Sequence, residues 1–188
     1  MSVELQNSKS ERVFKNLQFI SFANLLTISR LVITPFLIYT ILKDYYLISG
    51  ILVAAAVLSD WLDGIIARKT NDVTKHGELL DPAVDKIFTI SVLVAFVEKH
   101  LISTFVVFLI VLREMMVTWF RSVMVNRGVV VPASFYGKLK TTFQLIAIFL
   151  LSINVKEAGV ILLWLSIIIA YYSAFDYLKL FIKRKAWE

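Results

Sequence analysis

Long apolar runs, separated by short polar stretches, dominate the chain from residue 24 onward. A helix needs roughly 20 mostly apolar residues to cross the hydrocarbon layer of a bilayer. Six runs meet this length, and they cover residues 24–42, 47–67, 79–97, 101–124, 133–153 and 158–181. The pattern therefore predicts an all-α integral membrane protein with six transmembrane helices.

The polar links between these runs differ in length. Three of them, Lys43–Tyr46, Glu98–His100 and Asn154–Glu157, are short enough to predict antiparallel helical hairpins. The links around 68–78 and 125–132 are longer and more polar. Of the 20 lysines and arginines, three fall on the side of the short links. By the positive-inside rule, we expect the longer links and both termini in the cytoplasm.

The two ends of the chain are richer in charge than the runs between them. Residues 1–23 mix basic and apolar side chains, which predicts an amphipathic juxtamembrane helix on the membrane surface. Residues 24–182 would form the six-helix transmembrane domain, and residues 183–188 a basic cytoplasmic tail. Together these features predict a multi-pass protein of the cytoplasmic (inner) membrane with both termini in the cytoplasm.

Composition narrows the class of protein further. Apolar residues make up 59% of the chain and charged residues 18%, against a usual 45–50% and about 25%. Such a composition excludes a soluble enzyme and a disordered chain, because a small soluble fold cannot bury so much apolar surface. The chain has no cysteine, which excludes disulfides and thiolate metal sites. We interpret the net charge of +6 as contact with anionic lipid and expect no nucleic acid partner.

Four aspartates stand where the second apolar run ends and the third begins. Asp60 and Asp63 lie on one face of the predicted helix, and Asp81 and Asp85 are neighbours at a spacing of four residues. The link between the two runs returns the chain to the same side of the membrane. We therefore expect the four carboxylates to converge at one depth near the cytoplasmic face.

Clustered carboxylates repel one another, so burying them requires cations or protons. Hard oxygen ligands select Mg²⁺, Mn²⁺ or Ca²⁺ over zinc, and four carboxylates suffice for two ions that clamp phosphoryl oxygens. The bland alternative is ion pairing of the aspartates with Arg68, Lys86 or Arg113. Gly64 and Ala67 either pack helices or let a bulky ligand approach the helix backbone.

These residues form a pattern that resembles the signature of the CDP-alcohol phosphatidyltransferases at every fixed position. The pattern reads Asp60-x₂-Asp63-Gly64-x₂-Ala67-Arg68-x₈-Gly77-x₃-Asp81-x₃-Asp85. The resemblance implies six helices, a homodimer, and transfer of a phosphatidyl group from CDP-diacylglycerol to an alcohol with release of CMP. It also implies Mg²⁺ or Mn²⁺ as the cofactor, with two ions in each active site.

The same resemblance assigns roles to individual residues. The implied metal ligands are Asp60, Asp63, Asp81 and Asp85, the last of which is a ligand, the general base, or both. The residues implied to line the cytidine and diphosphate site are Gly64, Ala67, Arg68 and Gly77. No serine or cysteine nucleophile is needed for direct attack by the alcohol.

A second polar set follows in the fourth and fifth runs. Arg113 and Arg121 are about 80° apart around the helix, two turns along, and Lys138, Lys140 and Thr141 open the next run. Arginine forks suit phosphate, and lysine adds a point charge. The set predicts a pocket for the phosphate of a second, anionic substrate. Alternatively, Arg113 pairs with an acid and the lysines are ordinary cytoplasmic charges.

The acceptor follows from shorter motifs. These segments, together with Asn24-x₂-Thr27-x₂-Arg30, resemble the family members that use glycerol 3-phosphate. Asn24, Thr27 and Arg30 either contact the CDP-lipid or merely cap a helix and form ion pairs. The alternative acceptors are inositol phosphate, serine and phosphatidylglycerol. The rival from another class is a divalent-cation transporter, but transporter sites usually lie at the midplane between repeats, and no repeat is visible here.

Overall fold

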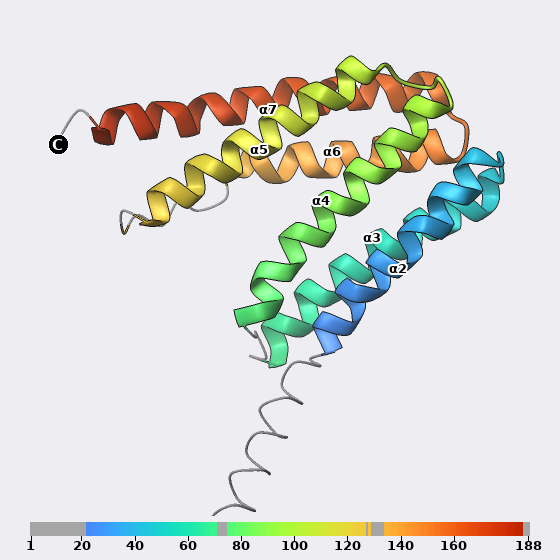
Figure 1. Ribbon diagram of the computed structural model, residues 1–188, viewed down its shortest axis with the longest axis horizontal. Helices are drawn as coiled ribbons and strands as arrows, with labels where there is room; N and C mark the ends of the chain where they lie inside the picture. The colour runs from blue at the N-terminus through green and yellow to red at the C-terminus, as the bar shows by residue number, and fades with distance from the viewer. Residues whose placement is uncertain (1–21, 71–74, 127, 129–133, 186–188) are drawn as a thin grey trace, which may run out of the picture.

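The computed structural model describes residues 22–70, 75–126, 128 and 134–185 (Figure 1). Within these ranges the chain forms helices and no strand. The helices are α2 (Phe22–Leu42), α3 (Tyr46–Thr70), α4 (Lys75–Glu98), α5 (Thr104–Asn126), α6 (Phe135–Ser152) and α7 (Lys156–Lys185). The predicted all-α class and the six predicted helices are confirmed. The predicted surface helix falls almost wholly on residues 1–21, which lie outside the described residues.

The helices form two arms that meet at one end of the molecule (Figure 1). In one arm α2 packs against α3 and α4, and in the other α7 packs against α5 and α6. Contacts between α3 and α6 and between α4 and α5 join the arms. The three short links all lie at the joined end, which we call the link end, and the arms diverge toward the other end.

Each short link reverses the chain by the same device. Asp44, His100 and Asn154 follow the ends of three helices with φ of 60°, 54° and 67°. The next residue in each link donates its N–H to a carbonyl five residues back, as Tyr45 does to Thr40 over 2.9 Å. This is a Schellman cap, which usually places glycine in the left-handed position. Asp, His and Asn tolerate that conformation better than most residues, so these links need no glycine.

Each helix begins at another residue than the sequence pattern predicts, and two of the starts differ by more than two residues. α5 begins at Thr104 and not at residue 101, because the cap at His100 extends the link and Ser103 accepts a bond from the Val106 N–H. α4 begins at Lys75, four residues before the predicted start, so that Pro82 lies inside the helix.

The core occupies the half of the molecule nearer the link end. Leu37 of α2, Val53 of α3 and Leu93 of α4 have no exposed surface, and they pack in one cluster with apolar side chains of α5, α6 and α7. Glycine allows a close helix approach: a Cβ on Gly159 of α7 would lie 2.7 Å from the Leu151 side chain of α6. This packing joins the helices near the link end, and the arms diverge toward the other end.

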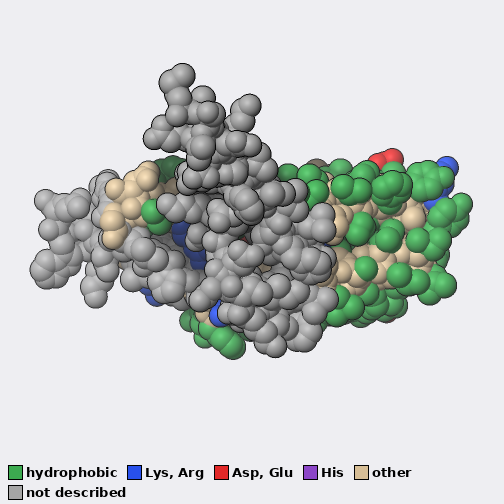
Figure 2. Space-filling model, turned by 90° about the horizontal axis from the view of Figure 1, so that it is seen from below, with side chains coloured by type: hydrophobic (Ala, Val, Ile, Leu, Met, Phe, Trp, Pro, Cys, Tyr) green, Lys and Arg blue, Asp and Glu red, His purple; other side chains and the backbone are tan. Residues whose placement is uncertain are grey.

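Large apolar side chains also cover the outside of the bundle. Phe36 is 63% exposed and Leu47 is 77% exposed. Figure 2, a view from below, shows hydrophobic side chains over much of the described surface. Among the described residues, one stretch, Lys156–Phe175, is long and apolar enough to cross a membrane by length and composition. Two shorter apolar stretches, Thr27–Leu42 and Tyr46–Ser59, lie in α2 and α3.

Candidate active site

A cavity of about 540 Å³ lies between α4, α5 and α6 on the side away from the link end. The early part of α4, the later part of α5 and the early part of α6 supply its walls. Among the described lining side chains, five are basic and two, Asp85 and Glu114, are acidic. The basic side chains are Lys86, Arg113, Arg121, Lys138 and Lys140. The described lining therefore carries an excess of positive charge, which suits an anionic ligand.

The wall formed by α6 starts at a capped helix end. Ser134 is the N-cap, and its hydroxyl accepts the N–H of Gly137 over 3.0 Å. The same hydroxyl lies 2.8 Å from that of Ser173, a fully buried residue of α7. Gly137, Lys138 and Thr141 all line the cavity. The bond to α7 thus fixes the segment of α6 that carries these residues.

Glu114 joins two of the basic groups. Its carboxylate accepts a hydrogen bond from Arg113 Nη1 over 2.9 Å and another from Lys140 Nζ. Arg113 is buried, and its Nε also donates to the carbonyl of Ala170 on α7 over 3.1 Å. The pairing of Arg113 with an acid, one of the two sequence alternatives, is therefore present, and Arg113 still lines the cavity.

Asp85 forms part of the opposite wall. Its carboxylate pairs with Arg30, a buried arginine of α2, while the aspartate side chain itself remains 46% exposed. Thr27, one turn earlier on α2, is also buried. Pairing, one of the two alternatives for Arg30, is thus observed. An ion pair with a buried arginine fixes the direction of the carboxylate.

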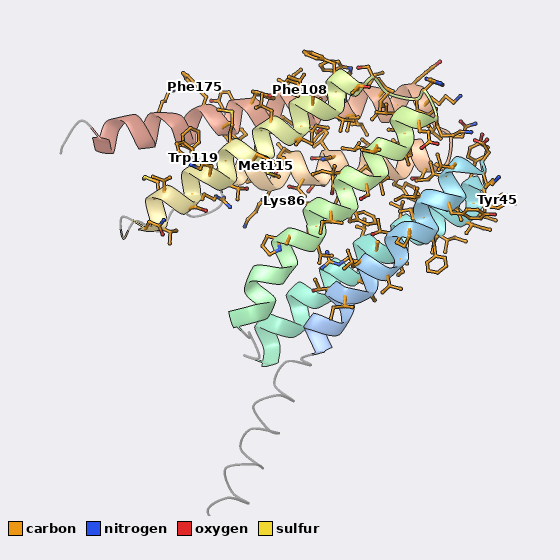
Figure 3. The ribbon with its side chains drawn as sticks, in the orientation of Figure 1. Tyr45, Lys86, Phe108, Met115, Trp119 and Phe175 are labelled. Atoms are coloured by element: carbon orange, nitrogen blue, oxygen red, sulfur yellow. The ribbon has the colours of Figure 1, made fainter. Side chains whose placement is uncertain are left out.

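Lys86 reaches across the cavity from α4 to α5 (Figure 3). Its Nζ donates to the hydroxyl of Thr118 over 2.5 Å, and that hydroxyl donates to the Glu114 carbonyl over 2.7 Å. Neither Lys86 nor Thr118 is in the predicted binding set. The sequence could have indicated Thr118, because it lies four residues after Glu114 and three before Arg121. The three residues therefore share a helix face.

The structure brings together the predicted acceptor residues and one of the four aspartates. Asp85, Arg113, Arg121, Lys138, Lys140 and Thr141 line the same cavity. The other motif residues lie in helical backbone, but their side chains lie outside the described residues. They are Asp60, Asp63, Gly64, Ala67 and Arg68 of α3, Gly77 and Asp81 of α4, and Asn24 of α2.

The described side chains contain no cluster of three or more acidic or histidine groups for a metal ion. Asp85 nevertheless offers a half-exposed carboxylate at the cavity wall, the oxygen donor that hard divalent cations prefer. Asp81 precedes it by one turn on α4, and the end of α3 that carries Asp60 and Asp63 lies at the same end of the molecule (Figure 1). The donor chemistry and the backbone arrangement fit a metal site.

Comparisons with known proteins add an independent finding. A sequence profile described as CDP-alcohol phosphatidyltransferase matches residues 20–172. The chain is 36% identical over 134 residues to an Aquifex aeolicus (strain VF5) protein, covering 70% of this chain and 74% of that one. It is 33% identical over 150 residues to a Bacillus subtilis (strain 168) protein, covering 76% and 75%. It is 30% identical over 179 residues to a Rickettsia felis (strain ATCC VR-1525 / URRWXCal2) protein, covering 89% and 96%. All three relatives are named CDP-diacylglycerol--glycerol-3-phosphate 3-phosphatidyltransferase.

Proposed function

This chain belongs to the CDP-alcohol phosphatidyltransferase family, and we propose that it transfers the phosphatidyl group of CDP-diacylglycerol to glycerol 3-phosphate. The products are phosphatidylglycerol phosphate and CMP, so the enzyme serves phospholipid biosynthesis. One observation supports the choice of acceptor: Asp85 and five basic side chains line the same cavity. An excess of positive charge in a partly enclosed site favours an acceptor that is itself an anion.

The reaction is one displacement at phosphorus. A hydroxyl oxygen of glycerol 3-phosphate forms a bond to the phosphorus that bears diacylglycerol, and the bond from that phosphorus to the CMP oxygen breaks. CMP leaves with the electron pair. Asp85 accepts the proton of the attacking hydroxyl, for which its exposed carboxylate at the cavity wall is suited. Arg30 holds this carboxylate in one direction.

Divalent metal ions belong to the proposal. Their proposed ligands are Asp60, Asp63, Asp81 and Asp85, with Mg²⁺ or Mn²⁺ as the preferred ions and two per site. When bound, such ions neutralise the diphosphate as Lewis acids. We place the CDP-lipid beside them, near Gly64, Ala67, Arg68 and Gly77, with Asn24, Thr27 and Arg30 closing the site from α2.

The acceptor phosphate would lie on the other side of Asp85. Arg113, Arg121, Lys138, Lys140 and Thr141 come from α5 and α6, away from the motif on α3 and α4. Arginine can bind a phosphate through two parallel bonds, which fixes orientation as well as charge. Holding the acceptor by its phosphate would aim its free hydroxyl at the phosphorus beside Asp85.

The surroundings of the bundle support a membrane enzyme. The exposed apolar side chains on α2, α3 and α7 would be costly in water and are favourable in lipid. We propose that all six helices span the cytoplasmic membrane, with the cavity and both termini on the cytoplasmic side, as the distribution of lysine and arginine indicates. We also propose a homodimer, on the family resemblance alone.

An acceptor panel tests the function. Purified protein in detergent with CDP-diacylglycerol is given glycerol 3-phosphate, inositol phosphate, inositol, serine or phosphatidylglycerol, and CMP release is measured with Mg²⁺ or Mn²⁺. We expect glycerol 3-phosphate to give the highest kcat/KM. A preference for serine or inositol would overturn the acceptor assignment. If none of the acceptors led to CMP release, the proposed transferase activity would be overturned.

Asp85→Asn separates the two roles proposed for Asp85. As the base, it should lose turnover far more than affinity for CDP-diacylglycerol, because the amide cannot accept the proton. Equal collapse of metal affinity, CDP-lipid affinity and turnover would make Asp85 chiefly a ligand. Binding of CDP-diacylglycerol to the detergent-solubilised variant, measured by calorimetry with and without Mg²⁺, distinguishes these outcomes.

A further inference from the structure

Lys86 is the one basic residue that the described part of α4 contributes to the cavity, and the proposed reaction assigns it no role. Its neighbour Asp85 faces Arg30 of α2, whereas Lys86 reaches to Thr118 of α5. Successive residues on a helix point about 100° apart, which explains how adjacent side chains serve different walls. Lys86 therefore belongs, by its contact, to the side of the cavity formed by α5.

The partner of Lys86 is a neutral group. Within the described part of the chain its ammonium group bonds to the hydroxyl of Thr118 and to no carboxylate. An ammonium group has three donors, and Thr118 accepts one of them. The hydroxyl leaves the positive charge without a counter-charge, so an anionic ligand in the cavity would be attracted to it.

Thr118 fixes the position of this charge. Its hydroxyl has one proton, which it donates to the Glu114 carbonyl over 2.7 Å, so it meets Lys86 as an acceptor. The same Glu114 binds Arg113 and Lys140 through its carboxylate. Glu114 of α5 thus positions Arg113 and Lys140 directly, and Lys86 through Thr118.

We propose that Lys86, positioned by Thr118, contacts the phosphate of the acceptor and selects a phosphorylated acceptor over its phosphate-free alcohol. This inference rests on the proposed function. The contact with α5 places the ammonium group among Arg113, Arg121 and Lys140, on the acceptor side of Asp85. A site built to pair with an anion rejects the analogue that leaves its charges unpaired.

Steady-state kinetics of Lys86→Met test the proposal. Methionine keeps the length and apolar stem and removes the charge. We expect the KM for glycerol 3-phosphate to rise about tenfold or more, as loss of a charged hydrogen bond predicts, while the KM for CDP-diacylglycerol changes by less than about twofold. The ratio of kcat/KM for glycerol 3-phosphate to that for glycerol should fall. Lys156→Met, at the link end, is the matched control and should leave all these values unchanged.

Thr118 gives a second variant that preserves charge and size. Thr118→Val removes the hydroxyl and should raise the KM for glycerol 3-phosphate about threefold or more. Thr118→Ser keeps the hydroxyl and should leave this KM at the wild-type value. These variants keep the proposal testable if Lys86→Met folds poorly. Calorimetric binding of glycerol 3-phosphate to detergent-solubilised protein gives a readout that does not depend on turnover.

The results separate the inference from the function on which it rests. Wild-type protein alone tests the function: preference for an unphosphorylated acceptor overturns both. With wild-type activity on glycerol 3-phosphate established, an unchanged KM in Lys86→Met and Thr118→Val overturns the role of Lys86. Equal rises in KM for both substrates overturn it as well, because they would show support of the whole site and not recognition of the acceptor.

Discussion

Two lysines at opposite ends of the bundle have contrasting partners. Lys99, at the link end, donates to the carboxylate of Asp44 over 2.5 Å, and Tyr46 donates to the other oxygen of that carboxylate. Lys86, in the cavity, donates to the neutral hydroxyl of Thr118. The first charge is neutralised within the protein, and the second is held in position while its charge stays available.

Empty volume does not separate the two lysines, because both border a cavity. Lys99 and Asp44 line one of about 260 Å³ at the link end. Lys86 lines the cavity of about 540 Å³, whose described side chains include two acids and five bases. What separates the two lysines is the partner: a carboxylate neutralises Lys99, whereas the neutral hydroxyl of Thr118 leaves the charge of Lys86 available to an anion.

Replacing one motif aspartate should have the largest effect. We expect Asp60→Asn, Asp63→Asn or Asp81→Asn to reduce turnover by roughly 10²–10³-fold or more, because each removes charge that stabilises the reacting phosphate. CMP release at ordinary Mg²⁺ concentration is the measurement. Asp44→Asn, an acid at the link end, is the control and should retain activity. Near-normal turnover in any motif variant would remove that aspartate from the set of essential ligands.

Enlarging a glycine at the link end should affect stability and not chemistry. In Gly159→Ala the new Cβ would lie 2.7 Å from Leu151 Cγ and 3.2 Å from the Leu151 backbone nitrogen. We expect a loss of about 1–3 kcal/mol in the free energy of unfolding, as for other overpacked contacts. Thermal unfolding in detergent measures it, with Ala158→Val at the adjacent exposed position as the control. Unchanged stability would mean that α6 and α7 separate at this contact without cost, and that their close approach does not need Gly159.

Arginine variants sharpen the comparison within the cavity itself. Arg113→Lys and Arg121→Lys keep the charge and lose the fork, so we expect the KM for glycerol 3-phosphate to rise about tenfold, or about 1.4 kcal/mol. The KM for CDP-diacylglycerol should change much less. In the Arg113 variant the bond to the Ala170 carbonyl is also affected, and its loss can loosen α7, so thermal unfolding of each variant is measured beside its kinetics. Equal shifts for both substrates would contradict a separate acceptor pocket.

The ion pair at the link end should contribute least. The hydrogen bond from Lys99, with a second from Tyr46, lowers the pKa of Asp44 below its ordinary value of 3.8. An aspartate whose pKa is lower in the folded state than in the unfolded state stabilises the fold at pH values above its unfolded-state pKa. This contribution disappears as the pH falls through the folded-state pKa. Because the carboxylate is solvent-exposed, we expect a small difference in Tm between wild type and Asp44→Asn at pH 7.

A pH series checks that expectation. The difference in Tm between wild type and Asp44→Asn should vanish below the lowered pKa, where Asp44 is protonated in both folded and unfolded states. A difference that grew on acidification would have the opposite sign and would rule out the ion pair as its source. A large difference at pH 7 would show that this pair supports the link end as much as the glycine contacts do.

Much of this arrangement follows from the sequence, for a physical reason. Apolar run length determines where helices lie, and all six predicted helices are confirmed. Helical periodicity shows which residues share a face, and Arg113 and Arg121 do line one cavity. The roles assigned to Asp60, Asp63 and Asp81 stay predictions, since their side chains lie outside the described residues.

What the sequence did not predict depends on how helices are rotated against one another. The bond from Lys86 to Thr118 and the pair of Arg30 with Asp85 join residues 32 and 55 positions apart. Periodicity within one helix carries no information about such contacts. The start of α5 was missed because a backbone cap at His100 determines it, and no glycine marks that cap in the sequence.

The bond between Ser134 and Ser173 has a consequence for the timing of biosynthesis. The walls of the cavity come from α4, α5 and α6, yet Ser173 of α7 holds the start of α6, and Ala170 of α7 binds Arg113. Both contacts are made by a helix that leaves the ribosome after α4, α5 and α6. A nascent chain that ends before residue 170 has every described residue that lines the cavity and lacks these two bonds to its walls. Catalytic competence should therefore appear only after α7 has joined the bundle.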